Sequence, residues 1–356
     1  MWFSRISFRT FYLLLGLILL VAIILSATTG AMDFSYAEIA GYLADGIGLR
    51  HDPGINVLQE KVFFHIRAPR IFLCAMVGAG LSVSGALMQA LFRNPIVEPG
   101  LIGTSSGAAF GAALVFVLGK SFGAISDTLI GALILPFFAF IGGLIATLTV
   151  YRLSSTGGRV TVATMLLAGI AINAVAAGGT GFLSYIARDP QARSITFWSL
   201  GTFSGADWNT LCVVTVVTIP SVLVALRYSK GLNALLLGES EAEYLGINTE
   251  KLKTRIILLN TLIVATATAG VGVIGFVGLI VPHLLRMMKS SDNRFLIIGS
   301  SLLGAIIMIL ADMVTRVIIA PAEFPIGIVT AVVGAPVFLW ILVRNKRSGF
   351  HGGFYA

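Results

Sequence analysis

The stretch IFLCAMVGAGLSVSGALMQALF, residues 71–92, runs for 22 positions without a charged side chain. A helix rises about 1.5 Å per residue, so a run of this length crosses the roughly 30 Å hydrocarbon core of a bilayer. Gly78, Gly85 and Ala86 supply small residues within it, and such residues let membrane helices approach one another closely. The stretch therefore predicts a membrane-spanning helix that packs against other helices.

Similar apolar runs fill most of the chain on either side. Of its 356 residues, 57% are hydrophobic and 11% are charged, whereas soluble domains carry about 25% charged residues. So few charges cannot cover a surface that faces water. We therefore expect an all-α, polytopic membrane protein whose residues 1–356 form one domain of about ten transmembrane helices. The expected spans are residues 11–29, 71–92, 100–119, 128–151, 160–187, 208–227, 254–271, 274–288, 295–318 and 325–343.

The positive charges indicate how these spans are oriented. With ten spans, 16 of the 24 Lys and Arg residues fall on the side that holds both termini, and the other eight fall on the opposite side. Loops that stay in the cytoplasm carry the excess of Lys and Arg, so both termini are expected there. The net charge is +8. Because the Lys and Arg residues stand between the apolar runs, their positions indicate membrane topology and give no reason to expect nucleic acid as a partner.

Two longer segments between spans stand out. Residues 30–70 are expected to form an outside loop, and residues 228–253 a cytoplasmic loop. The second loop places three acids, Glu239, Glu241 and Glu243, after an apolar run at residues 235–237. This pattern fits a short amphipathic helix that lies against a partner. It equally fits a solvated loop that caps two spans, and the loop alone favours neither interpretation.

The sequence contains no motif for catalysis, nucleotide binding or metal binding. It has no G-x-x-x-x-G-K-[ST] phosphate-binding loop, so no catalytic residue and no bound nucleotide are expected on this chain. The four histidines, His51, His65, His283 and His351, do not have the spacing of metal ligands. We therefore expect no metal site and no cofactor on the chain.

Acidic residues are scarce within the expected spans. Asp312 stands four positions before Arg316, and this spacing on a helix predicts a local ion pair. No chain of histidines and carboxylates crosses the bilayer, although such chains usually mark proton relays. The pattern argues against a proton-coupled transporter.

Several stretches resemble the permease subunits of type II ABC importers, the family that carries vitamin B12, ferric siderophores and haem. They follow the family's order along nearly the whole chain. They are RAPR at residues 67–70, GALMQALFRNPIVEPGLIGTSSGAAFG at 85–111, LLAGIAIN at 166–173, FWSLGTFSGADW at 197–208, LGESEAEYLGI at 237–247, GFVGLIVPHLLR at 275–286 and AEFPIGIVTAVVGAPVFLWIL at 322–342.

The resemblance implies a ten-span importer subunit that is multi-pass in the bacterial inner membrane. It implies a homodimer with the transport pathway between two copies. Two cytoplasmic ATP-binding subunits, which hold ATP and Mg, and a periplasmic substrate-binding protein would complete the assembly. Rival interpretations are a secondary transporter driven by ions and a channel or scaffold without an energised cycle.

Residue roles follow from the resemblance where positions match. Arg67, Arg70 and Arg316 would receive acidic residues of the binding protein at the outer face, because arginine pairs with carboxylates in a defined geometry. Pairing with lipid headgroups or within the chain is the alternative, and Asp312 is the obvious internal partner for Arg316.

The cytoplasmic segment at residues 238–246 resembles the coupling helix that rests in a groove of each ATPase. The matching positions are Gly238, Glu239, Ala242, Leu245 and Gly246.

A movement of this helix would be passed to the fifth span, whose four glycines are expected to make it easy to bend. The expected gate and pathway residues are Thr161, Thr164, Asn173, Gly178 and Gly179.

The substrate is suggested by the run RDPQARSITFWSLG, residues 188–201, which is most similar to haem permeases. Aromatic residues such as Phe182, Tyr185 and Phe197 could contact a flat ligand, but aromatic residues are also common at any membrane interface. Haem is therefore favoured, with ferric siderophores and cobalamin as alternatives.

Overall fold

A computed structural model describes residues 6–30, 32–46, 56–119, 129–157, 159–318 and 324–347. Within these ranges seven helices are long and apolar enough to cross a membrane. They are α1 (Phe8–Thr28), α4 (Ala68–Leu91), α6 (Leu129–Ser154), α7 (Val162–Ile186), α9 (Trp208–Leu237), α11 (Thr249–Val271) and α13 (Asn293–Ile318). Three further apolar helices are α5 (Thr104–Leu118), α12 (Val277–Met288) and α14 (Ile326–Arg347).

Each of the ten expected spans coincides with one of these helices, so the prediction of an all-α membrane protein is confirmed. The number of crossings stays a prediction, because the apolar parts of α5, α12 and α14 are shorter than the other spans. One pair of two-residue strands, β1 (Ser155–Thr156) and β2 (Arg159–Val160), runs antiparallel between α6 and α7.

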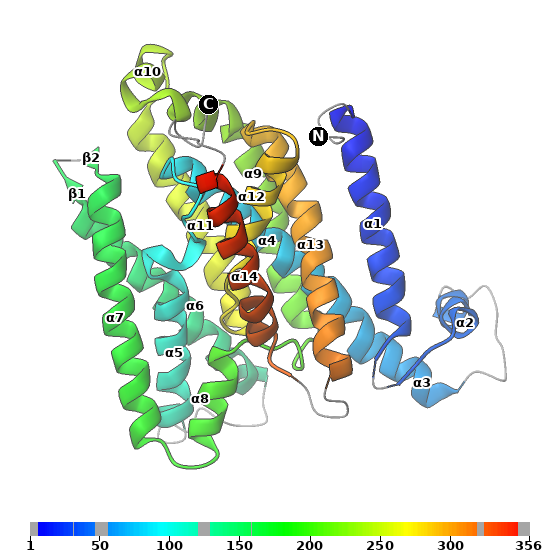
Figure 1. Cartoon of the computed structure of the whole chain (residues 1–356). Coiled ribbons are helices and arrows are strands. Elements are labelled where there is room, and N and C mark those ends of the chain that lie inside the picture. The colour runs from blue at the N-terminus through cyan, green and yellow to red at the C-terminus, as the bar shows by residue number, and fades with distance from the viewer. Residues whose placement is uncertain are drawn as a thin grey trace.

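Helix α4 forms the centre of the bundle. All of its residues except Phe72 and Met76 are buried, and α9, α11, α12 and α13 pack around it (Figure 1). Gly85 allows α12 to approach it, since a Cβ atom at this position would overlap the backbone of Gly278. The stretch that predicted a packed membrane helix is therefore the core of the fold.

Glycine also brings α5 against α6, because small residues let membrane helices approach closely. A Cβ atom at Gly107 would lie 2.5 Å from the carbonyl oxygen of Gly142, and one at Gly111 would overlap the carbonyl of Phe138. Close backbone contact of this kind gains dispersion energy where no hydrophobic force acts between helices.

The segment expected to form an outside loop, residues 30–70, is helical over much of its described length. Its residues 31 and 47–55 lie outside the described ranges, but the rest contains α2 (Tyr36–Gly46), α3 (Val57–Val62) and a π-helical turn (Phe63–Arg67) that continues into α4. Ser35 and Glu38 form a reciprocal capping box at the start of α2. The π-helical turn comes just before Pro69, whose ring and missing N–H do not fit a regular helix interior.

The expected cytoplasmic loop at residues 228–253 is also shorter than predicted. Helix α9 continues to Leu237, and α11 already begins at Thr249, with the short α10 (Glu239–Tyr244) between them. Within the expected loop the Ser229 hydroxyl donates to the carbonyl of Leu226, and Leu232 beyond it is buried, so the helix continues through both. The short helix itself was expected and is present.

The two ends of the bundle differ. The start of α1, the end of α14, the β1–β2 hairpin and α10 lie at one end, whereas α2, α3 and α8 (Gln191–Ser199) lie at the other (Figure 1). This arrangement agrees with an even number of crossings. It also places α10 at the same end of the bundle as the start of α1 and the end of α14 (Figure 1), as the charge distribution predicted.

The turn between α11 and α12 lies within the protein. Gly272 has φ +79° and Phe276 has φ +67°, and a Cβ atom at Gly272 would overlap the carbonyl of Trp198. The N–H of Thr202 donates to the carbonyl of Val271 at 2.8 Å. These contacts provide the cover that a glycine-rich turn at membrane depth needs.

Candidate functional site

The short helix α10 projects from one end of the bundle (Figure 1). It begins after Gly238, whose φ of +142° suits glycine, and ends before Gly246, whose φ is +81°. Ala242 is completely buried against the bundle, whereas Leu245 is 63% exposed and Tyr244 is 91% exposed. One face of α10 therefore holds the helix in place, and the other presents apolar side chains that have no partner within the described chain.

The expected gate residues lie on α7, the least buried of the long helices. Thr161 is the N-cap residue of α7, and Thr164 lies in its first turn; both side chains are exposed. Further along, the amide of Asn173 is directed at the carbonyls of Gly100 and Leu101 at 3.4 and 3.3 Å, which are long for hydrogen bonds.

The expected pathway glycines differ from each other. A Cβ atom at Gly178 would meet nothing within 4 Å, whereas one at Gly179 would lie 2.5 Å from the ring of Phe110. Gly179 therefore serves close packing on α5, and Gly178 faces open space. A cavity of about 230 Å³ lies between α5, α7 and the end of α8, and Ser106, Thr180 and Ser199 help to line it.

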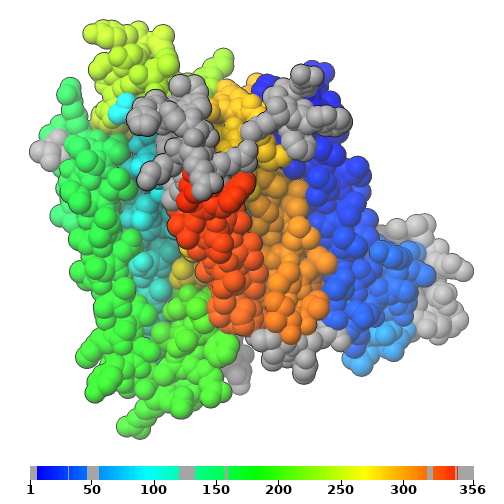
Figure 2. Space-filling model, in the orientation of Figure 1, coloured from blue at the N-terminus to red at the C-terminus, as the bar shows by residue number. Residues whose placement is uncertain are grey.

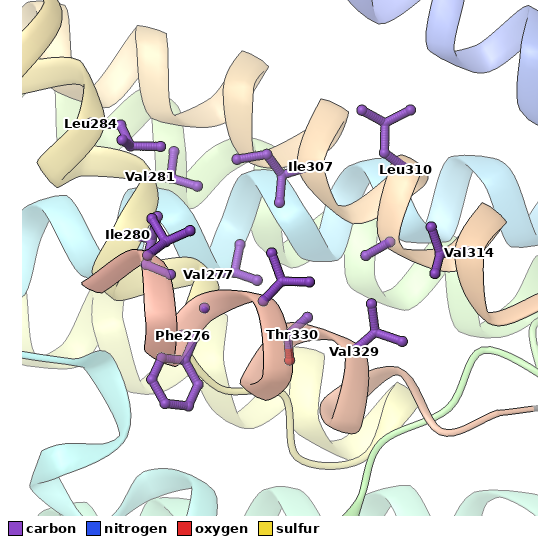
Figure 3. A pocket seen from close by; sticks show the side chains of 14 residues that line it. Phe276, Val277, Ile280, Val281, Leu284, Ile307, Leu310, Val314, Val329 and Thr330 are labelled. Carbon is purple, nitrogen blue, oxygen red and sulfur yellow. The ribbon is translucent and has the colours of Figure 1, made fainter. Parts of the chain in front are cut away.

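The face between α7 and α14 is recessed, with atoms of the cyan and teal segments at its floor (Figure 2). A second cavity of about 360 Å³ lies between α12, α13 and α14 (Figure 3). Apart from Thr330, its lining residues are apolar or glycine, with Ile280, Ile307 and Val333 among them. This space separates part of α14 from the core, so α14 is only partly held by the bundle.

The three arginines expected at the outer face are buried. Arg67 and Arg70 are each 7% exposed and Arg316 is 9% exposed. The Asp312 carboxylate lies between two of them, 3.0 Å from Arg70 Nη2 and 3.0 Å from Arg316 Nε. The predicted ion pair between Asp312 and Arg316 is therefore confirmed, and Arg70 joins it.

The same cluster holds the end of α1. Arg67 donates to the carbonyls of Ala27 at 3.0 Å and of Met32 at 2.7 Å, and its guanidinium lies 4.6 Å from the Phe34 ring centroid. Arg316 donates to the carbonyl of Thr29 at 2.9 Å. Carbonyls at a helix C-terminus lack helical partners and carry partial negative charge, so the arginines satisfy both needs. In this conformation the arginines are bound within the chain, and their role in docking stays a prediction.

Sequence reasoning missed Glu98, a mostly buried carboxylate between α4 and α5. It accepts a hydrogen bond from the backbone N–H of Phe276 at 2.9 Å, directly before α12. A carboxylate at a helix N-terminus is stabilised by the helix dipole. The signal was present in the sequence as an acid between two apolar spans, but nothing local linked it to residue 276.

Lys253 was also missed. The sequence counted it among the cytoplasmic charges, whereas the structure buries it to 1% exposure beneath α10. Its ammonium group contacts two carboxylates, those of Glu239 and Glu250. Of the residues expected to form the coupling segment, Glu239 is therefore the one with an ionic bond to the bundle.

These features define a class. A bundle of membrane-length helices, with a projecting short helix at one end and a recessed face along its length, is typical of a multi-pass permease. The model of the FecCD transport family matches residues 18–344. The chain belongs to this family and is an ABC importer permease.

Individual relatives agree with this assignment. The chain is 39% identical over 345 residues to the hemin transport system permease protein HmuU of Yersinia pestis, covering 95% of this chain and 98% of that protein. It is 37% identical over 288 residues to the vitamin B12 import system permease protein BtuC of Citrobacter koseri, covering 81% and 84%. The solved structure of a metal-chelate type ABC transporter in an inward-facing conformation matches with a TM-score of 0.81 and 32% identity, covering 94% of this chain and 99% of that one.

Proposed function

We propose that this chain is the membrane-spanning subunit of an importer that moves haem from the periplasm to the cytoplasm across the bacterial inner membrane. It works as a homodimer with two cytoplasmic ATP-binding subunits and a periplasmic substrate-binding protein. The observation that carries the proposal is the exposed apolar face of α10, formed by Tyr244 and Leu245. Apolar side chains that are exposed on a helix fixed to the bundle by its other face suit contact with a protein partner.

The preference for haem has two supports. One is the identity to the Yersinia pestis hemin permease along almost the whole chain. The other is the surface at the outer end of α7 and at α8, where Phe182, Tyr185 and Phe197 are exposed. Flat aromatic surfaces can stack on a porphyrin. The relation to a vitamin B12 permease keeps cobalamin as an alternative, together with ferric siderophores.

The pathway is proposed to run along the recessed face beside α7, between two copies of the chain. Thr161 and Thr164 would form the gate at the end that also carries α10. Asn173, Gly178 and Gly179 would lie further along the path. The open space at Gly178 supports this proposal, because a helix can bend there without displacing a neighbour.

The partly buried carboxylate of Glu98 is the one observation that favours an ion-driven transporter. Its hydrogen bond from Phe276 gives it a structural role at the start of α12, with no second acid or histidine bonded to it among the described residues. An importer driven by ATP therefore remains the better account.

Uptake by reconstituted vesicles tests the substrate. The chain is co-purified with its ATP-binding subunits, inserted into vesicles that contain ATP, and supplied with the binding protein and one of three probes: haem, cyanocobalamin or a ferric hydroxamate. ATP-dependent accumulation of haem, at least tenfold above the other two probes, is expected. Accumulation of cyanocobalamin or the ferric hydroxamate in preference to haem would reject haem as the substrate.

A further inference from the structure

A buried lysine joins the projecting helix α10 to the strand that precedes α7. The Lys253 ammonium lies 2.7 Å from Glu239 Oε2, in the first turn of α10, and 2.9 Å from Glu250 Oε1. It also donates to the backbone carbonyl of Val160 at 3.1 Å. An ammonium group has three donors, and these three acceptors lie on three different elements: α10, α11 and β2.

Both backbone polar groups of Val160, the last residue of β2, are bonded to α11. While the carbonyl of Val160 accepts from Lys253, its N–H donates to Glu250 Oε2 at 2.8 Å. The side chain of Val160 is buried in the same apolar cluster as Ile256 of α11. Because a buried charge is costly unless all its bonds are made, the group strongly favours one arrangement of its members.

The bonded group around Lys253 is directly connected to the expected gate residue Thr161. Thr161, the N-cap residue of α7, directly follows Val160, and its N–H donates to the carbonyl of Ser154 at 3.1 Å. Met165, one turn into α7, is buried in the same apolar cluster as Val160. The start of α7 is therefore fixed to β2, and β2 is fixed through Lys253 to α10.

We propose that Lys253 is a positioning residue that transmits the movement of α10 to the cytoplasmic end of α7. The inference rests on the proposed function, in which partner subunits act on α10 during ATP hydrolysis. When α10 is displaced, Glu239 pulls on the buried ammonium, which cannot leave its other two acceptors without losing its charge compensation. Val160 and the start of α7 therefore move with it.

The two ends of this link can be cut separately. Lys253→Met removes the ammonium group and keeps most of the side-chain volume. Glu239→Ala removes only the bond to α10 and leaves Lys253 paired with Glu250 and Val160. Lys251→Met is the matched control, because the Lys251 side chain is exposed and lies only two positions away on the same helix.

The experiment uses the full complex in vesicles, with haem and binding protein outside and ATP inside. The number of haem molecules imported per ATP hydrolysed is measured, together with the ATPase rate and the recovery of ATP-binding subunits on the purified chain. In Lys253→Met and Glu239→Ala the import ratio is expected to fall at least tenfold. Lys253→Met, whose side chain is buried beneath the coupling segment, should keep the ATPase rate and subunit recovery within twofold of the unchanged protein. Lys251→Met should import normally.

Movement of α7 is measured directly by a spin label at Leu167→Cys, an exposed position on α7. Cys74 is buried, so only Cys212 has to be replaced. The label-to-label distance across the dimer should change when ATP is added to the unchanged protein, and this change should be lost in Glu239→Ala. A merely structural role of the bond would lower subunit recovery and leave the ATP-dependent change in the assembled fraction.

Three outcomes decide the proposal. Normal import by Glu239→Ala overturns it, as does an ATP-dependent distance change that survives in this variant. If Lys253→Met fails to fold, Glu239→Ala still decides, since it keeps the buried charge paired. Failure of the unchanged complex to import haem with ATP would instead reject the proposed function, and the two failures are therefore distinguishable.

Discussion

Arg70 donates from its Nε atom to the carboxylate of Asp312 at 3.0 Å, although the two residues stand 242 positions apart in the sequence. The bond joins α4, at the centre of the bundle, to α13. Arg316 contacts the same carboxylate from one turn further along α13. A single acid thus compensates two buried guanidinium groups at the end of the molecule where the binding protein is proposed to dock.

Removal of this acid should destabilise the protein strongly. Asp312→Asn leaves Arg70 and Arg316 buried without a counter-charge, and breaking a buried ion pair in this way costs about 3–5 kcal/mol. Thermal unfolding of the purified protein in detergent measures the change. Asp33→Asn is the control, because Asp33 is an exposed acid near the cluster, and exposed charges contribute about 0–1 kcal/mol. Equal effects of the two substitutions would contradict the assigned role of Asp312.

Docking of the binding protein gives a second test of the cluster. If Arg67 receives an acid of the binding protein, Arg67→Glu should weaken association at least tenfold, and more so at low salt, where charges are less screened. The affinity for the binding protein, immobilised on a sensor surface, is measured at two salt concentrations. A thermal scan first checks that the variant still unfolds cooperatively. Unchanged affinity at both salt concentrations would show that the arginine serves only the end of α1.

The sequence was sufficient to place the ten apolar helices, because an apolar run of membrane length indicates that the bilayer is its solvent. Ten runs were expected, and each coincides with a helix. The errors lie at the ends of the two segments expected to be loops, residues 30–70 and 228–253. Ser229 satisfies its hydroxyl on the preceding turn, so α9 continues through it. Pro69 follows a π-helical turn, so the helix before it joins α4.

Glu98 provides a third prediction. Glu98→Ala removes the acceptor of the Phe276 N–H, and an unsatisfied buried backbone donor costs about 1–3 kcal/mol. Glu98→Gln keeps an oxygen acceptor and should cost less. The midpoint of thermal unfolding compares the two variants, and the alanine variant is expected to unfold at the lower temperature. Identical midpoints for both variants and the unchanged protein would contradict a capping role at α12.

Two glycines of α7 form a matched pair for a fourth prediction. A Cβ atom at Gly169 would overlap the carbonyl of Leu101, whereas one at Gly178 meets open space. Gly169→Ala should therefore destabilise the protein. Gly178→Ala should stabilise α7 by up to about 1 kcal/mol, because alanine favours the helix. If α7 bends during transport, Gly178→Ala should also slow haem uptake at least threefold. Uptake at the normal rate would exclude bending at this position.

The site could be predicted only where its parts are close together in the sequence. The pairing of Asp312 with Arg316 follows from helical spacing. The pattern of acids at residues 239–243 left a short helix and a solvated loop open, and only the family resemblance favoured the helix. Contacts between distant segments gave no local signal. The sequence around Lys253 and Val160 does not indicate that they are bonded, and the same holds for Phe276 and Glu98. Both contacts depend on how whole helices pack.

The measurement that tests the account most directly is haem uptake by vesicles that hold either the chain alone or the chain with its ATP-binding subunits. The account predicts accumulation against a gradient only when both the partner subunits and ATP are present. It also predicts that Leu245→Asp, which puts a charge on the exposed face of α10, abolishes this accumulation. Accumulation by the chain alone, driven by a proton or sodium gradient, would contradict the account.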